Sequence, residues 1–144
     1  MALSTGDILT QPMTKLGVTT GLGEQVHAEA TQVTVAEATR TLGRILTDRL
    51  LAYVVNVRDV KTLARWESGR VSEIRIANEQ RLRAAYEIAA LLGRMEGAST
   101  VRAWFIGMDP YLSDASPADA IHDGHLQEAL NAARSFIAYG GMGG

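Results

Sequence analysis

The chain has 144 residues, enough for one domain that buries a substantial core without a disulfide or a metal. It contains no cysteine, which excludes a thiol nucleophile, a cysteine-rich zinc site and an iron–sulfur cluster. Its 14 basic and 16 acidic residues give a net charge of −2, and this total argues against a nucleic-acid binder. No apolar run approaches a membrane span, and the first residues lack the pattern of a signal peptide. We therefore expect a cytoplasmic protein.

The composition favours an all-α fold, since alanine is abundant, only 3 residues are proline and strand-like alternation is scarce. Residues 1–33, rich in Thr, Gly and Gln, are expected to form a loose arm with at most one short helix. The first clear helix signal is a capping box, in which the hydroxyl of Thr34 accepts the amide of Glu37. It predicts a helix over 35–46.

Two short helices follow, separated by a tight turn. Thr47 and Asp48 can start a helix that runs to residue 55. Asn56 suits a left-handed turn, because asparagine tolerates positive φ. The next helix is predicted over 60–67, and Ser68-Gly69 ends it.

The second half of the chain is predicted as a loop over 70–77 and then further helices joined by short turns. The helix starts are assigned to Asn78, Ser99 and Ser116-Pro117. The ends and breaks are assigned to Gly93 or Gly97, Asp109-Pro110, Asp123-Gly124 and Gly140-Gly141.

The segment from Leu51 to Arg70 is the most informative stretch: an apolar helix, a turn and a short helix with two distinct faces. The apolar positions of the second helix recur three apart and are expected to pack inward: Val60, Leu63 and Trp66. The basic and polar positions on the outward side, with one cation just beyond the helix, are the predicted DNA contacts: Arg58, Lys61, Thr62, Arg65 and Arg70. A recognition helix needs an apolar side that holds it and a cationic side that enters the major groove.

Taken alone, this short helix is equally well explained as an ordinary amphipathic helix with a solvated basic face. The distribution of charge favours DNA. Between Arg40 and Arg83 lie 10 of the 14 basic residues but only 5 acidic ones, a local net charge of +5. The remainder carries 4 basic and 11 acidic residues, a net charge of −7. The net charge of −2 is therefore the sum of a cationic segment and an acidic remainder. The cationic segment coincides with the helix–turn–helix pattern, as expected for phosphate binding.

The same segment resembles the Xre-type helix–turn–helix. Residues 61–70 (Lys-Thr-Leu-Ala-Arg-Trp-Glu-Ser-Gly-Arg) are typical of the end of its recognition helix, and Asn56 stands where that family usually has Gly. The C-terminal third is similar to the toxin-binding domain of the Xre/MbcA/ParS antitoxins. The similarity lies in residues 101–112 (Val-Arg-Ala-Trp-Phe-Ile-Gly-Met-Asp-Pro-Tyr-Leu), residues 116–121 (Ser-Pro-Ala-Asp-Ala-Ile) and a final helix that ends at Gly140.

The resemblance implies three parts: an N-terminal arm (1–33), an Xre-like helix–turn–helix domain with a long connecting helix (34–97), and a helical toxin-binding domain with a Gly-rich tail (98–144). It implies an antitoxin that neutralises a RES-domain toxin, which degrades NAD⁺, and that represses its own operon by binding DNA. Such an antitoxin is no enzyme and needs no cofactor.

The residues expected to face a protein partner are those nearest the tail: Phe136, Tyr139, Gly140 and Gly141. For the glycines, a frayed terminus is the alternative explanation. Trp104 and Phe105 are expected to be core residues instead, because aromatic side chains at helix ends are usually packed.

Other motifs point to no further chemistry. His122, His125, Asp119 and Asp123 could suggest a metal site, but Gly124 would break the helix that presents them and no further strong ligand follows. We therefore predict no metal. Neither a phosphate loop nor a nucleophile elbow is present in the sequence.

Two other functions stay open. One is a stand-alone transcriptional regulator or DNA-binding protein whose C-terminal domain only dimerises. The other is a helix–turn–helix used purely as a protein-interaction module. A homodimer is expected because such proteins read two half-sites, and the helix from Asn78 and the acidic C-terminal third are both candidates for its interface.

Overall fold

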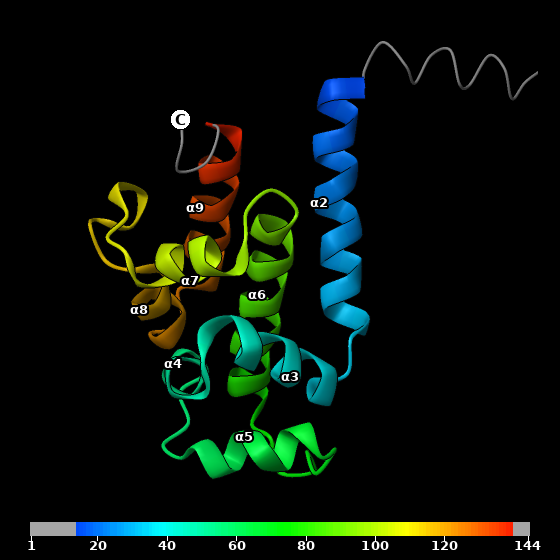
Figure 1. Cartoon of the computed structure of the whole chain (residues 1–144), viewed down its shortest axis with the longest axis vertical. Helices are drawn as coiled ribbons and strands as arrows, with labels where there is room; N and C mark the ends of the chain where they lie inside the picture. Colours follow the sequence, from blue (N-terminus) through cyan, green and yellow to red (C-terminus); the bar gives the residue numbers. More distant parts are fainter. Residues whose placement is uncertain (1–13, 140–144) are drawn as a thin grey trace, which may run out of the picture.

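The computed structural model describes residues 14–139, and over this range the chain is all-α, with no β-strand (Figure 1). This confirms the predicted fold class. The elements in chain order are α2 (Thr14–Gln32), α3 (Val35–Leu46), α4 (Asp48–Val54), α5 (Val60–Glu67), α6 (Ile76–Gly93), α7 (Ala98–Ile106), the 3-10 helix η2 (Pro110–Leu112), α8 (Pro117–His122) and α9 (Leu126–Ala138).

Helix α6 is the centre of the fold and packs against helices from both halves of the chain (Figure 1). Its side chains Leu82, Ile88 and Leu92 are fully buried. A helix that is apolar on more than one side belongs inside a bundle. Burial of each of these side chains contributes roughly 1.5–3 kcal/mol, so α6 is the main hydrophobic support of the fold.

One hydrophobic core joins the two halves of the chain. It includes Leu42 of α3, Trp66 of α5 and Ala133 of α9. Trp104 and Phe105 of α7 also belong to it, which confirms their predicted burial. The core continues across residue 98, so the C-terminal helices directly support the helices that precede them.

The local signals of the first half are confirmed. Helix α3 spans the predicted residues, and Thr34 Oγ1 accepts a hydrogen bond from the amide of Glu37 at 3.1 Å. Asn56 has a φ of 64° and Gly69 a φ of 87°, the left-handed turn and helix stop that their residue types predicted. In the second half, Ser116 caps α8 as expected.

The N-terminal segment differs from the expected loose arm, because α2 is a helix of 19 residues. Its side chains Val26 and Ala30 are buried, and α2 packs on α6. Tertiary packing of this kind stabilises a helix whose threonines and glycines give it poor intrinsic propensity. Residues 1–13 lie outside the described residues.

Two predicted helix starts are wrong. Helix α6 begins at Ile76, before Asn78, and α7 begins at Ala98, before Ser99. The residue that caps each of these starts makes no side-chain hydrogen bond, so capping chemistry does not mark them in the sequence. In α6, Glu79 lies in the first turn, where the helix dipole favours a carboxylate.

Candidate nucleic-acid interface

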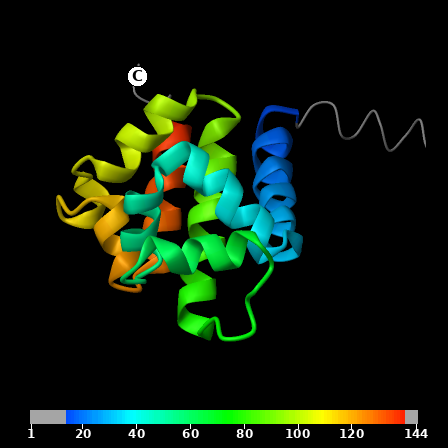
Figure 2. The same ribbon diagram turned by 60° about the horizontal axis from the view of Figure 1, so that its bottom comes forward.

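Helices α4 and α5 and the turn between them form a helix–turn–helix that packs on α3 (Figure 2). Val54 of α4 and Leu63 and Trp66 of α5 are buried where the helices meet. Asp59 begins α5, since its Oδ1 accepts the amide of Lys61 at 2.8 Å. The short second helix is therefore held at its start by a cap and along one side by the core.

Val60 is not a core residue, and this prediction is wrong: its side chain is 46% exposed. Each residue of an α-helix is rotated by about 100° from the one before it. Leu63 and Trp66 are therefore only about 60° apart and share the buried face, whereas Val60 lies about 120° from Trp66. A spacing of three repeated twice drifts too far to stay on one face.

A groove of about 770 Å³ lies between α5 and the loop that leads into α6. Figure 2 brings this end of the molecule forward. Most of the predicted DNA contacts line the groove together: Arg58, Thr62, Arg65 and Arg70. Arg75 and Asn78 line its other wall, and sequence reasoning missed both. The signal for Arg75 was the positive charge that continues beyond Gly69, but a predicted loop does not indicate where its side chains point.

Lys61 is exposed and does not line the groove. It lies on the outer side of α5 with Val60 and Ala64, which are also exposed. Lys61 and Arg65 are only about 40° apart around the helix, so both remain on the predicted cationic face, although only Arg65 lines the groove.

The groove is strongly positive, because its arginines greatly outnumber its one carboxylate, that of Glu73. The arginines are Arg58, Arg65, Arg70 and Arg75, and none of them pairs with a carboxylate within residues 14–139. Arg65 donates instead to Thr62 Oγ1 at 3.2 Å, which orients its guanidinium along α5. Exposed guanidiniums gathered in this way suit a ligand with several phosphates.

Three other cations of the +5 segment make hydrogen bonds to the protein's own backbone. Each donates to a carbonyl oxygen at a helix end: Arg40 to Glu67 (2.8 Å), Arg81 to Ile121 (3.0 Å) and Arg83 to Val33 (2.7 Å). Carbonyl groups at helix C-termini lack helical partners, and the helix dipole favours a cation there. Arg81 and Arg83, which are only partly exposed, therefore contribute less to the cationic surface than the sequence count suggests.

A polar clamp of Tyr53, Asp119 and His122 joins α4 to α8. The hydroxyl of Tyr53 donates to Asp119 Oδ1 at 2.5 Å, and the Tyr53 ring stacks on His122 with centroids 4.1 Å apart. His122 Nδ1 lies 2.7 Å from the carbonyl oxygen of Tyr53. The hydrogen bond with Asp119 raises the pKa of Tyr53 to about 12, and the same bond lowers the pKa of Asp119. The clamp fixes the helix–turn–helix to the C-terminal helices.

The histidines of the C-terminal half form no metal centre in the described part of the chain. There, no group of three or more His, Asp or Glu side chains could hold a metal ion. His122 belongs to the clamp, and His125 lies 3.4 Å from the carboxylate of Glu128.

The residues predicted to face a protein partner have different surroundings. Phe136 is half-buried against Trp104, with ring centroids 6.2 Å apart. Tyr139 is 71% exposed and lies near Tyr111, itself 60% exposed. Desolvation and the neighbouring Tyr139 hydroxyl raise the pKa of Tyr111. Residues 140–141 lie outside the described residues.

Comparison of the chain with family models, curated proteins and solved structures finds no match. Among the helices of residues 14–139, none is both long and apolar enough to cross a membrane. Function is therefore inferred from the groove, the exposed aromatic residues and the sequence motifs.

Proposed function

We propose that this protein is a DNA-binding antitoxin that represses its own operon and neutralises a RES-domain toxin in the cytoplasm. The observation that carries the DNA-binding half is the cationic groove beside α5. Arg58 and Arg65 meet there with Arg70 and Arg75 from the loop before α6, and no described carboxylate pairs with them. The protein acts by binding, without catalysis and without a cofactor.

In this proposal the exposed side of α5 enters the major groove of operator DNA. Lys61 and Arg65 approach base edges, where an arginine can donate two hydrogen bonds to guanine. Arg70 and Arg75 contact phosphates and set the register of the helix on the duplex. Thr62 contacts a phosphate or a thymine methyl group.

The exposed aromatic residues support the protein-partner half. Tyr111 and Tyr139 lie together at the C-terminal end of α9, and Ile106 and Met108 are also largely exposed in the segment before Tyr111. Exposed apolar side chains of this size mark interaction surfaces, and tyrosine is enriched in them. We propose that the toxin binds this face.

A reporter fused to the DNA upstream of the gene tests repression in cells. We expect Arg65→Ala combined with Arg70→Ala to relieve repression at an unchanged protein level, because both guanidiniums line the groove. Arg94→Ala is the control, since it removes a cation from the opposite end of α6. Equal repression by the double variant and the wild type would refute the assignment of the recognition face.

Co-expression with the neighbouring open reading frame tests the toxin half. We expect a RES-like neighbour to arrest growth alone and to be neutralised by the wild type but not by Tyr139→Ala. Deletion of residues 140–144 is preferable to deletion of residues 134–144, because the shorter deletion keeps the contact between Phe136 and Trp104. Without a RES-like neighbour, a stand-alone regulator is the better account. A toxin complex without DNA binding would indicate a protein-interaction module.

A further inference from the structure

An apolar groove of about 620 Å³ lies between α2 and α9, with α6 as its floor. Its apolar lining comes from Leu22 and Gly23 of α2, Leu91 of α6, and Ile137 and Ala138 of α9. A groove of this volume holds about 20 waters at the density of the liquid. Release of that water from apolar walls would favour any occupant that covers them.

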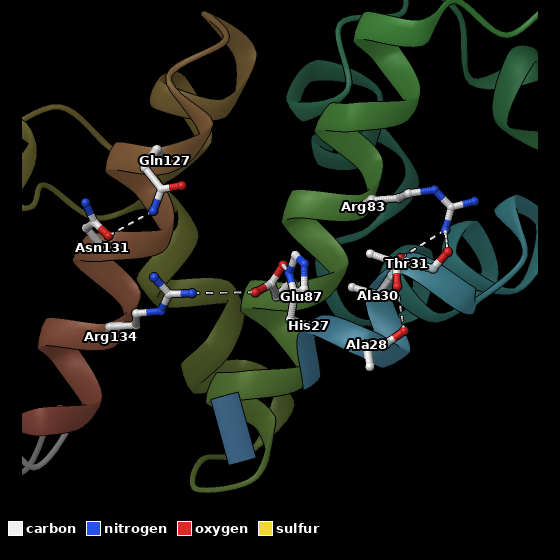
Figure 3. A network of polar contacts seen from close by, with 9 residues as sticks. All are labelled: His27, Ala28, Ala30, Thr31, Arg83, Glu87, Gln127, Asn131 and Arg134. Atoms are coloured by element: carbon white, nitrogen blue, oxygen red, sulfur yellow. Dashed lines mark hydrogen bonds and ion pairs between the residues drawn. The ribbon is translucent and has the colours of Figure 1, made fainter. Parts of the chain in front are cut away.

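The buried carboxylate of Glu87 links both walls to α6. Glu87 of α6 is 5% exposed, and its carboxylate points between the two outer helices (Figure 3). Glu87 Oε1 lies 3.0 Å from His27 Nδ1 of α2, and Glu87 Oε2 lies 3.8 Å from Arg134 Nη2 of α9. Both outer helices are thus tied to α6 rather than to each other, so the groove between them is a fixed feature of the fold.

The charges on the rim indicate what covers the groove. Glu24 is exposed on the α2 wall, and Arg134 is half exposed on the α9 wall. A two-fold axis parallel to the groove would place the α2 wall of each copy against the α9 wall of the other copy. Glu24 of one copy would then meet Arg134 of the second, twice in each dimer. We propose that this groove is the contact surface between two copies of the chain.

The ends of the same chain match the rim less well. Residues 140–144 are glycines and one methionine and carry no side-chain charge, and residues 1–13 contain a single charged side chain, Asp7. Neither segment carries both a basic and an acidic side chain to match Glu24 and Arg134. A second copy supplies both partners.

The groove is separate from the other surfaces of the protein. Arg134, Ile137 and Ala138 share one face of α9, whereas Phe136 and Tyr139 lie on another, towards Trp104 and Tyr111. The groove is lined by α2, α6 and α9, and α5 lies at the other end of the molecule from α2 and α9 (Figure 1). A dimer formed here leaves both recognition helices exposed, but the inference holds whether or not DNA is the ligand.

The test compares two glycine variants of the full chain. A Cβ atom at Gly23 or at Gly21 would meet no other heavy atom within 4 Å, but only Gly23 lines the groove. Both substitutions to glutamine favour the helix, so neither should destabilise the fold of the monomer. Sedimentation equilibrium should give a dimer for the wild type and for Gly21→Gln. We expect Gly23→Gln to raise the dimer dissociation constant at least about fivefold, because its side chain fills space that the second copy needs.

A charge exchange adds a second readout. Glu24→Arg should weaken the dimer, and combining it with Arg134→Glu should restore most of the affinity. A wild type that stays monomeric, or a dimer that responds to neither Gly23→Gln nor Glu24→Arg, would overturn the proposal. So would a monomer in which NMR contacts place residues 1–13 or 140–144 in the groove.

Discussion

Arg83 is expected to contribute more to stability than any surface ion pair, because it fastens α2 to α6. Its Nη1 donates to the carbonyl oxygens of Ala30 at 2.9 Å and Val33 at 2.7 Å, while its Nε lies 2.9 Å from Glu79 Oε2. The side chain is 25% exposed. Hydrogen bonds that involve a charged group contribute about 1.5–3 kcal/mol each. Allowing for partial exposure and loss of both carbonyl bonds, Arg83→Ala should lower the unfolding free energy by about 2–4 kcal/mol.

Arg94→Ala is the matched control at the same helix pair. Arg94 Nη2 lies 2.7 Å from Glu29 Oε1 of α2, but both side chains are exposed, at 38% and 44%. An exposed pair of this kind contributes at most about 1 kcal/mol. Urea denaturation measures both losses, and amide exchange in α2 shows whether its docking is weakened locally. A loss for Arg83→Ala no larger than that for Arg94→Ala would refute the reasoning.

Three further outcomes follow from the local geometry. Tyr53→Phe should cost about 1 kcal/mol near neutral pH. The wild-type unfolding free energy should fall in acid as Asp119 is protonated, because the pKa of Asp119 is lowered in the folded protein. It should also fall as pH rises from 10 towards 12, because Tyr53 ionises at lower pH in the unfolded chain than in the folded protein. The unfolding free energy of Tyr53→Phe should vary less with pH in both ranges. Asn56→Gly should change the unfolding free energy by under about 0.5 kcal/mol, whereas Asn56→Val should cost about 1–2 kcal/mol in thermal melts, because valine resists a φ of 64°. Tyr139→Ala should be neutral within about 0.5 kcal/mol in urea denaturation, whereas Phe136→Ala should cost roughly 2 kcal/mol, less than a fully buried phenylalanine.

The parts of the fold that sequence predicts well are those encoded within a few residues. The Thr34 cap, the Asn56 turn and the Gly69 stop each depend on the side chain or backbone freedom of one residue. They place α3, the turn and α5 correctly, and with them the candidate recognition helix. The predicted burial of Val60 is wrong because it assumes that residues three apart stay on one face of a helix over two repeats. Each step of three residues turns the position by about 60° around the helix, so the difference accumulates.

The parts that sequence does not predict depend on partners far along the chain. Helix α2 has poor intrinsic propensity and is stabilised by packing on α6. Tyr53 and Asp119 are 66 residues apart, so nothing local announces their hydrogen bond. Arg81 and Arg83 look in the sequence like DNA-binding cations, but the fold directs them to carbonyl oxygens at helix ends. Charge counting found the cationic segment, and only the fold separates its surface arginines from its internal ones.

Salt-dependent DNA binding tests the central claim most directly. Fluorescence anisotropy would compare a duplex from upstream of the gene with a scrambled duplex of equal length, at several salt concentrations. Each phosphate contact contributes about 0.9 to the steepness of the slope of log affinity against log salt concentration. The double variant Arg70→Ala with Arg75→Ala should therefore reduce this slope by about 1.8 per chain and lower the affinity for both duplexes equally. Arg65→Ala should instead reduce the ratio of the affinity for the upstream duplex to the affinity for the scrambled duplex. A wild type with no preference between the duplexes, or a salt slope that these variants leave unchanged, would contradict DNA recognition by α5 and its groove.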